Sequence, residues 1–240
     1  GCSLQCIFCQ NHSIAVGKSG ISLTLERLTD IFLKLQEKGA ANINLVTAGH
    51  FLPQICHALE QAKACGLHIP VVYNTGGYEK ISSLQLLEGL ADIYLPDLKY
   101  CSADLSARYS QAPDYFFRAA EAISEMLRQT GRPIIDPATG LMKRGVIVRH
   151  LVLPGQTRDS KKILRFLHET FGNDIYISIM NQYTPMAQVS DFSELSRPVT
   201  PEEYRRVLDF ADKIGIEQGF FQEGGTVSES FIPSFDGEGL

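Results

Sequence analysis

Short apolar segments alternate with helix-forming segments along most of this chain, and that alternation restricts the fold more than any other feature. The apolar segments are brief and rich in strand-forming residues, which predicts strands at 42–47, 69–73, 91–95, 146–152, 174–180 and 216–221. Helices are expected at 25–35, 53–65, 83–90, 103–109, 114–129, 159–171 and 201–214. Strands and helices in alternation form parallel β-α units with right-handed crossovers. The sequence therefore predicts an α/β fold whose sheet curves into a partial barrel.

Local signals mark several of these boundaries. Thr24 is the expected cap of the first helix, and the segment 200–203 (Thr-Pro-Glu-Glu) is a capping box with proline at the first helical position. Residues 133–142 are expected to form a turn or hairpin before the next strand. The chain shows no repeat beyond the strand–helix period and no linker, so we expect one domain over 1–240, with 224–240 as a tail.

Three of the six cysteines lie at the amino end of the chain. Cys2, Cys6 and Cys9 have the spacing C-x3-C-x2-C. A loop this short can bring three thiolates to one inorganic centre, and soft sulfur ligands select iron–sulfur clusters, zinc or copper. A four-iron cluster closed off by protein usually takes four cysteines, so three would leave one iron free to bind another molecule. Zinc is the alternative, because His12 could complete a tetrahedral site of three cysteines and one histidine.

The remaining cysteines are scattered at Cys56, Cys65 and Cys101. A chain of 240 residues does not need disulfides to stabilise its core, and a reducing compartment suits a cluster-binding protein. Small buried cysteines on helices are common in protein cores. We therefore assign no function to these three residues.

The cysteine spacing, with the aromatic Phe8 directly before the third cysteine, resembles the signature of the radical S-adenosylmethionine (radical SAM) enzymes. The resemblance implies that Cys2, Cys6 and Cys9 hold a 4Fe-4S cluster, and that the amino and carboxylate groups of SAM chelate the open iron. It also implies that reductive cleavage of SAM forms a 5′-deoxyadenosyl radical, which abstracts a hydrogen atom from the substrate.

The dipeptide Gln10-Asn11 and further patches as far as about Pro185 are most similar to the branch related to pyruvate formate-lyase activating enzyme, and to its PflX-type members in particular. The resemblance implies a partial (β/α)6 TIM-type barrel. In that family a strand precedes the cysteine loop, whereas this sequence enters the motif at its second residue, so we expect the first strand to be missing. The resemblance also implies an electron donor such as flavodoxin or ferredoxin. The first candidate substrate is a backbone glycine of a partner protein, as in glycyl-radical enzyme activation.

Polar residues fall at the carboxyl ends of five of the expected strands. They lie at 47–50, 74–77, 97–99, 149–150 and 181–183. In β/α barrels the loops after the strands open onto one face, where the reacting groups gather. We therefore expect these five segments to surround one site.

Cofactor contacts follow from the resemblance where positions match; they are Phe8, Asn11, Gly49, His50, Asn74, Thr75, Asp97, Lys99 and Arg149. Asp97 and Lys99 face the same side of a strand, so a plain salt bridge is the alternative to a role near the SAM ribose or a cation. Arg149 resembles the arginine that pairs with the SAM carboxylate, a role that suits its planar fork. A structural buried ion pair is the alternative, because an arginine inside a strand needs a partner.

One segment departs from the family pattern. The segment after the second family strand often reads Gly-Gly-Glu and holds the SAM amino group, whereas residues 47–50 read Thr-Ala-Gly-His, without a carboxylate. Gly49 would still let the backbone approach a ligand, and His50 is either a hydrogen-bonding residue or a loop histidine. The missing carboxylate and the available His12 leave a rival open, a zinc-binding or cluster-binding module without catalysis.

Charge and hydropathy argue against two classes of partner. The formal net charge of -5 disfavours a generic nucleic-acid binder, which needs a basic patch. The short basic runs at 161–162 and 205–206 fall on expected helices and are interpreted as solvated faces. No apolar run approaches the ~18 residues that a membrane-spanning helix needs. We therefore expect a cytoplasmic protein with no nucleic-acid or membrane partner.

Overall fold

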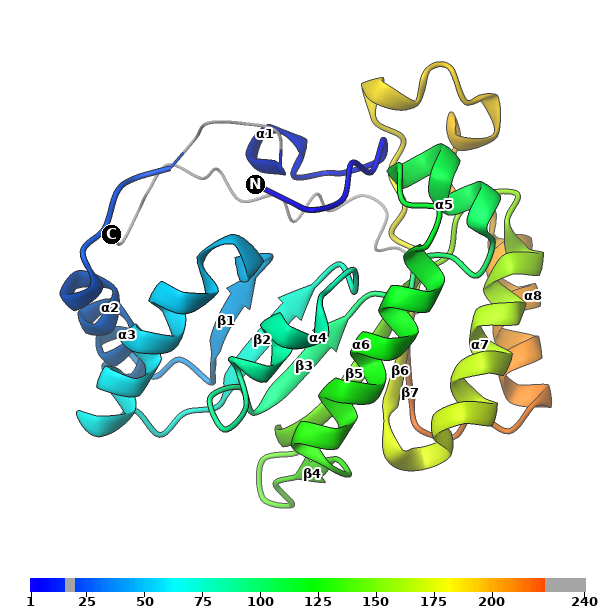
Figure 1. The fold of residues 1–240 in the computed structure, drawn as a ribbon. Helices are drawn as coiled ribbons and strands as arrows, with labels where there is room; N and C mark the ends of the chain where they lie inside the picture. Colours follow the sequence, from blue (N-terminus) through cyan, green and yellow to red (C-terminus); the bar gives the residue numbers. More distant parts are fainter. Residues whose placement is uncertain (16–19, 223–240) are drawn as a thin grey trace.

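The structure of the protein, a computed structural model, describes residues 1–15 and 20–222, so the tail predicted at 224–240 lies outside the described residues. Its centre is a sheet with strand order β1-β2-β3-β5-β6-β7 (Figure 1). These strands are β1 (Ile43–Val46), β2 (Val71–Thr75), β3 (Ile93–Pro96), β5 (Met142–Leu151), β6 (Tyr176–Met180) and β7 (Gly219–Phe221). All neighbours in this order are parallel, and in the described part of the chain β1 and β7 do not pair. The predicted α/β partial barrel is confirmed, and its sheet is open.

Helices follow the strands, and α3, α4, α6 and α7 lie over one face of the sheet (Figure 1). The α-helices are α1 (His12–Ala15), α2 (Leu25–Glu37), α3 (Leu52–Ala64), α4 (Ile81–Gln85), α5 (Ala103–Ser110), α6 (Tyr115–Thr130), α7 (Thr157–Phe171) and α8 (Pro201–Lys213). Short 3-10 helices are η1 (Ala48–Phe51), η2 (Gly172–Asp174), η3 (Ala187–Val189) and η4 (Ser193–Leu195). The side chains of Thr24 and Thr200 accept hydrogen bonds from the first turns of α2 and α8, which confirms both predicted caps.

Two elements differ from their predicted ranges for local reasons. The helix predicted at 83–90 is α4, which starts at Ile81 and ends at Gln85, before Gly89 turns the chain with a φ of 76°. Strand β5 begins at Met142, ahead of the predicted 146–152, because its first residues pair antiparallel with β4 (Ile134–Ile135). The pairing forms the hairpin predicted at 133–142.

The interior contains a group of fully buried tyrosines, which are Tyr73, Tyr94, Tyr100, Tyr109, Tyr115 and Tyr183. A buried tyrosine needs a hydrogen-bond partner for its hydroxyl. Tyr183 donates to the Leu195 carbonyl at 2.7 Å, and Tyr109 donates to Glu194 Oε1 at 2.7 Å. The first bond lies within the loop between β6 and α8, and the second ties that loop to Tyr109 at the end of α5.

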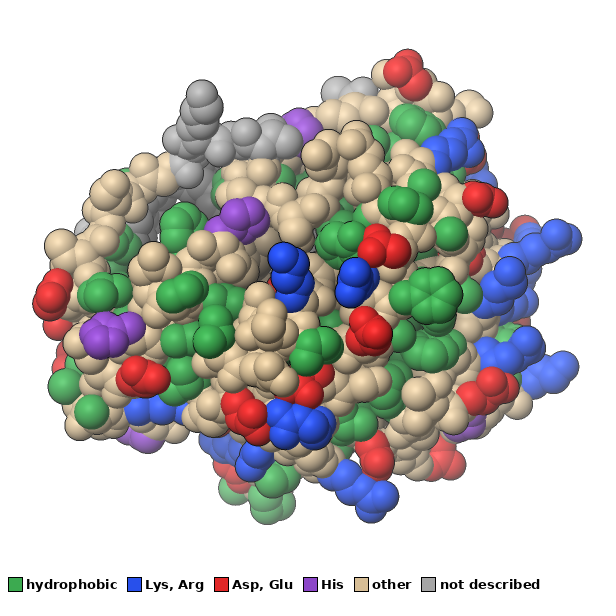
Figure 2. All heavy atoms as spheres, viewed as in Figure 1, with side chains coloured by type: hydrophobic (Ala, Val, Ile, Leu, Met, Phe, Trp, Pro, Cys, Tyr) green, Lys and Arg blue, Asp and Glu red, His purple; other side chains and the backbone are tan. Residues whose placement is uncertain are grey.

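The surface carries both signs of charge. Figure 2 shows acidic and basic side chains interspersed over the visible face, with Lys and Arg more frequent toward α7 and α8. The predicted basic runs at 161–162 and 205–206 do lie on these two helices. Among the residues that the structure describes, no helix has the length and apolar character of a membrane span.

Candidate functional site

The amino-terminal loop that carries the three cysteines lies above the carboxyl tips of β1 to β3 (Figure 1). Two apolar side chains, Leu4 and Phe8, are buried and anchor it. The Phe8 ring packs edge-on against Tyr100 and Tyr183, with ring centroids 6.4 and 6.0 Å apart. The Ile7 amide also donates to the carbonyl of residue 109 at 3.0 Å. The loop is therefore fixed by packing on both sides of Cys6.

The three thiols line one cavity of about 280 Å³. Ser110 Oγ donates a hydrogen bond to Cys6 Sγ at 3.0 Å. Burial raises the pKa of the Cys6 thiol, although the Lys99 ammonium group opposes that shift, and burial also raises the pKa of Cys9. A bound metal centre would supply the positive charge that stabilises these groups as thiolates. The donor set of three soft ligands on one wall fits an iron–sulfur cluster.

A single metal ion fits the same thiols less well. Among residues 1–15 and 20–222, no three His, Cys, Asp or Glu side chains lie together in the arrangement that one metal ion requires. In a zinc site every sulfur lies about 2.3 Å from the same ion. In a four-iron cluster each cysteine binds a different iron, so the three thiols need to line one cavity without meeting at a single point.

A polar network forms the opposite wall of this cavity, at the ends of β2, β3 and β5. Arg149 Nε donates to Asp97 Oδ1 at 2.9 Å, and Arg149 Nη2 donates to Asn74 Oδ1 at 2.7 Å. Lys99 Nζ pairs with the other oxygen of Asp97. The salt bridge between Asp97 and Lys99, the alternative to a cofactor role in the sequence analysis, is therefore present. Arg149 also has the ion pair that an arginine inside a strand requires.

These charges stabilise one another. Burial raises the pKa of Asp97, but the positive charges of Lys99 and Arg149 outweigh that effect and hold the pKa of this carboxyl below its ordinary value. Burial lowers the pKa of Lys99, and the negative charge of Asp97 more than reverses that shift. Arg149 Nη1 has no hydrogen-bond partner among the described residues. The network is thus charged throughout and retains donor capacity for an anionic ligand.

A close backbone approach positions this network. Gly77 has a φ of 82°, and a Cβ on it would lie 2.1 Å from the carbonyl oxygen of Asp97. The Tyr115 hydroxyl lies 2.8 Å from both the Gly76 and the Asp97 carbonyl oxygens, and it accepts a bond from the Lys99 amide at 3.1 Å. Gly77 therefore allows the loops after β2 and β3 to meet, and Tyr115 joins them.

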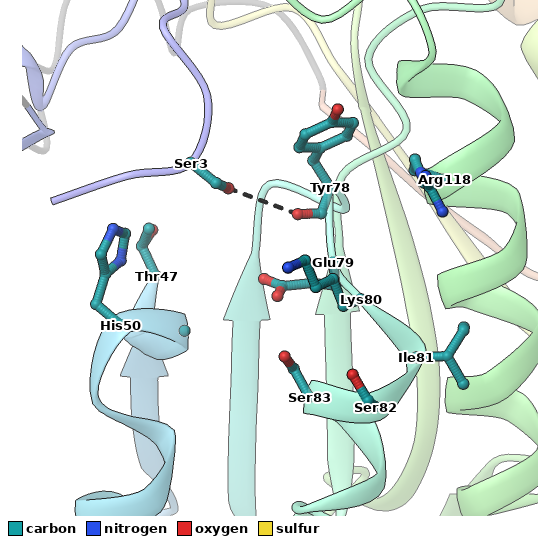
Figure 3. A pocket seen from close by; sticks show the side chains of 11 residues that line it. Ser3, Thr47, His50, Tyr78, Glu79, Lys80, Ile81, Ser82, Ser83 and Arg118 are labelled. Carbon is teal, nitrogen blue, oxygen red and sulfur yellow. Dashed lines mark hydrogen bonds between the residues drawn. The ribbon is translucent and has the colours of Figure 1, made fainter.

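The structure brings together most of the residues that the sequence predicted. The cavity of the thiols is lined by Cys2, Cys6, Phe8, Cys9, Asn11, Asn74, Thr75, Asp97, Lys99 and Arg149. Gly49 and His50 lie in η1 and line a neighbouring cavity of about 670 Å³, and Thr47 lines both (Figure 3).

His150 was expected at the same site, and that expectation is wrong. Successive residues of a strand face opposite sides, so His150 points away from the cavity that Arg149 lines. Its Nδ1 lies 2.8 Å from the Leu98 carbonyl oxygen, and Nε2 is buried without a partner in the described structure. Burial lowers the pKa of His150 to about 4, so the ring is neutral near pH 7.

Sequence reasoning missed Glu79, which lines the second cavity. Its carboxylate accepts hydrogen bonds from Thr75 and from Tyr73, the latter at 3.3 Å. Its only signal in the sequence is a carboxylate two residues beyond Gly77, close behind a strand end. A glutamate in a loop is too common to be singled out without the spatial neighbours.

Solved structures of other proteins share this fold. A crystal structure of the FeFe-hydrogenase maturase HydG from Carboxydothermus hydrogenoformans matches 92% of this chain and 50% of its own, with 14% identity and a TM-score of 0.61. A domain of pyruvate-formate lyase-activating enzyme from Bacteroides vulgatus matches 76% of this chain and 98% of its own, with 10% identity and a TM-score of 0.52. At these identities the likeness shows the fold alone.

Sequence comparison extends to a relative and a family. The protein MJ0674 of Methanocaldococcus jannaschii is 26% identical over 225 residues, which are 90% of this chain and 61% of that relative. The chain thus spans less than two thirds of the length of this relative. The model of the Radical SAM superfamily matches residues 1–167, a range that includes the three cysteines and Arg149. The chain therefore belongs to the radical SAM superfamily.

Proposed function

We propose that this chain is an enzyme that cleaves SAM reductively, with a 4Fe-4S cluster held by Cys2, Cys6 and Cys9. One observation carries the proposal: the three thiols and the charged network of Asp97 and Arg149 line the same cavity. When bound, the cluster would supply the electron that splits SAM into methionine and a 5′-deoxyadenosyl radical.

The protein residues have separate parts in this proposal. Arg149 would bind the carboxylate of SAM through Nη1, while the bonds from Nε and Nη2 to Asp97 and Asn74 hold its guanidinium group in one orientation. Asp97 and Lys99 would keep the network charged, and Thr75, whose hydroxyl donates to Glu79, would line the cavity beside Asn74. Buried apolar groups such as Leu4 and Phe8 would limit the access of water to a radical.

The remaining contacts in this proposal come from two segments. Phe8 and Asn11 come from the cysteine loop itself, and Gly49 with His50 comes from the turn after β1. Gly49 would allow the backbone to approach a ligand. His50 would donate or accept a hydrogen bond at the edge of the second cavity.

We further propose that the substrate is a protein, with hydrogen abstracted from a backbone glycine, and that a flavodoxin or ferredoxin supplies the electron. Support comes from the resemblance of the motif segments to the activating-enzyme branch and from the shared fold. We also propose that residues 1–240 form one domain, since a single continuous sheet links β1 to β7.

The test is product formation from SAM. We expect the full chain, reconstituted anaerobically with iron and sulfide and reduced with dithionite, to form 5′-deoxyadenosine and methionine. Cys6→Ala should lose both products because the cluster loses a ligand, whereas Cys65→Ala, at an exposed free cysteine, should retain them. An intact cluster without these products would favour the non-catalytic module instead.

A further inference from the structure

The second cavity has a functional group that the proposed reaction has not yet used. It opens between η1, which follows β1, and the segment that leads into α4, and Ser3 of the cysteine loop lies at its edge (Figure 3). Thr47 and His50 lie on one side, and Glu79 extends toward them from the other side. The cavity therefore adjoins the cluster loop and contains a carboxylate.

Two hydroxyl groups fix the orientation of this carboxylate. Thr75 Oγ1 and Tyr73 OH both donate to Oε1 of Glu79, the second at 3.3 Å. The other oxygen, Oε2, lies 3.5 Å from the position that a Cβ on Gly49 would occupy. Because residue 49 is glycine, the space in front of Oε2 is free of side-chain atoms from that residue.

Glu79 forms no ion pair within the described residues, and the basic side chain that acts on its charge is His50. None of their Lys, Arg or His side chains forms an ion pair with this carboxylate. Burial raises the pKa of Glu79, while the bonds from Thr75 and Tyr73 and the nearby His50 oppose that shift. A partly buried carboxylate that is held as an acceptor and has no ion-pair partner is an arrangement that a positively charged ligand completes.

We propose that Oε2 of Glu79, across the space over Gly49, binds the ammonium group of SAM. The inference rests on the proposed function, and it gives this chain a carboxylate from the loop after β2, where the segment 47–50 has none. Glu79 lies close enough to the cluster loop for this role, because Thr47 lines both cavities and because Ser3, at the edge of the second cavity, adjoins Cys2. A charge-assisted hydrogen bond to a carboxylate would distinguish SAM from a ligand that lacks the amino group.

The experiment compares two ligands. SAM and an analogue in which hydrogen replaces the amino group are titrated calorimetrically into the reconstituted full chain, its Glu79→Gln variant and a Glu169→Gln control. Glu169 is exposed on α7. We expect Glu79→Gln to weaken SAM binding about 10- to 100-fold, since it removes one member of a charged hydrogen-bonded pair. The analogue should bind the parent and Glu79→Gln equally, and the control should match the parent with both ligands.

Two results would overturn the inference. If Glu79→Gln weakens both ligands by the same factor, Glu79 only shapes the cavity, and if it weakens neither, Glu79 does not contact the ligand. A melting curve shows whether the variant folds; if it does not, Gly49→Ala takes its place, because its methyl group fills the space before Oε2. That variant should weaken SAM more than the analogue, and equal effects would again overturn the inference. Failure of the proposed function is distinct, since the parent itself would then neither bind SAM nor form 5′-deoxyadenosine.

Discussion

Replacing Gly77 with alanine should destabilise the protein more than a positive φ angle alone explains. An L-residue in the left-handed region costs about 1 to 2 kcal/mol, part of which is offset because alanine restricts the unfolded chain. At Gly77 the new Cβ would also lie 2.1 Å from the backbone oxygen of Asp97, so the loops must separate. That movement breaks hydrogen bonds of the buried Tyr115 hydroxyl, each worth about 1 kcal/mol. The total is about 3 kcal/mol.

Gly89→Ala is the matched control, because Gly89 has a φ of 76° and a Cβ on it would have no atom within 4 Å. For a chain of this size 1 kcal/mol corresponds to about 2 to 4 °C in Tm. We therefore expect Gly77→Ala to lower Tm by about 6 to 12 °C and Gly89→Ala by less than about 4 °C, measured by circular dichroism with the denaturant midpoint as a second readout. Equal losses for the two variants would refute the close-approach argument.

Two further changes test charged groups. The hydrogen bonds from Arg197 lower the pKa of Glu203 to about 2, below its unfolded value, so this carboxylate stabilises the fold above about pH 4.5 and loses that effect as the pH falls through 2. Glu203→Gln should lower the free energy of unfolding by about 1 to 2 kcal/mol at pH 7 and by little at pH 2. The control Glu202→Gln, at an exposed residue, should not lower it at either pH. Curves of stability against pH that run parallel for the parent and Glu203→Gln would contradict this prediction. Arg149→Ala should weaken SAM binding about 10-fold or more in calorimetry, and Arg144→Ala, on the same strand, should leave it unchanged; equal affinities for both variants would argue against the carboxylate role.

The fold was largely predictable because its signals are short-range. Each strand is a compact apolar run, and each long helix repeats apolar residues at helical spacing, so both can be recognised without knowing their neighbours. The side chains of Thr24 and Thr200 cap amides only three residues away, so these caps could also be predicted from the sequence. The extent of α4 was not, because it depends on where the chain turns at Gly89.

The sequence predicted most of the residues that line the site, but it predicted less of their geometry. Strand ends placed Asp97 and Arg149 on one face, yet the bond between them joins residues 52 positions apart and depends on the pairing of β3 with β5. The alternation of β5 turns His150 away, a consequence that the sequence pattern itself contained. Glu79 could not be found in this way, because its approach to Gly49 results from the loops after two paired strands.

The central claim is that three cysteines hold a cluster with one open iron. Low-temperature electron paramagnetic resonance of the reduced, reconstituted chain, recorded with and without SAM, tests it most directly. We predict that the parent gives a reduced 4Fe-4S signal, and that this signal changes when SAM is added. The Cys65→Ala variant should retain the signal, and the Cys6→Ala variant should lack it. A colourless zinc protein, or a cluster signal that saturating SAM leaves unaltered, would contradict the claim.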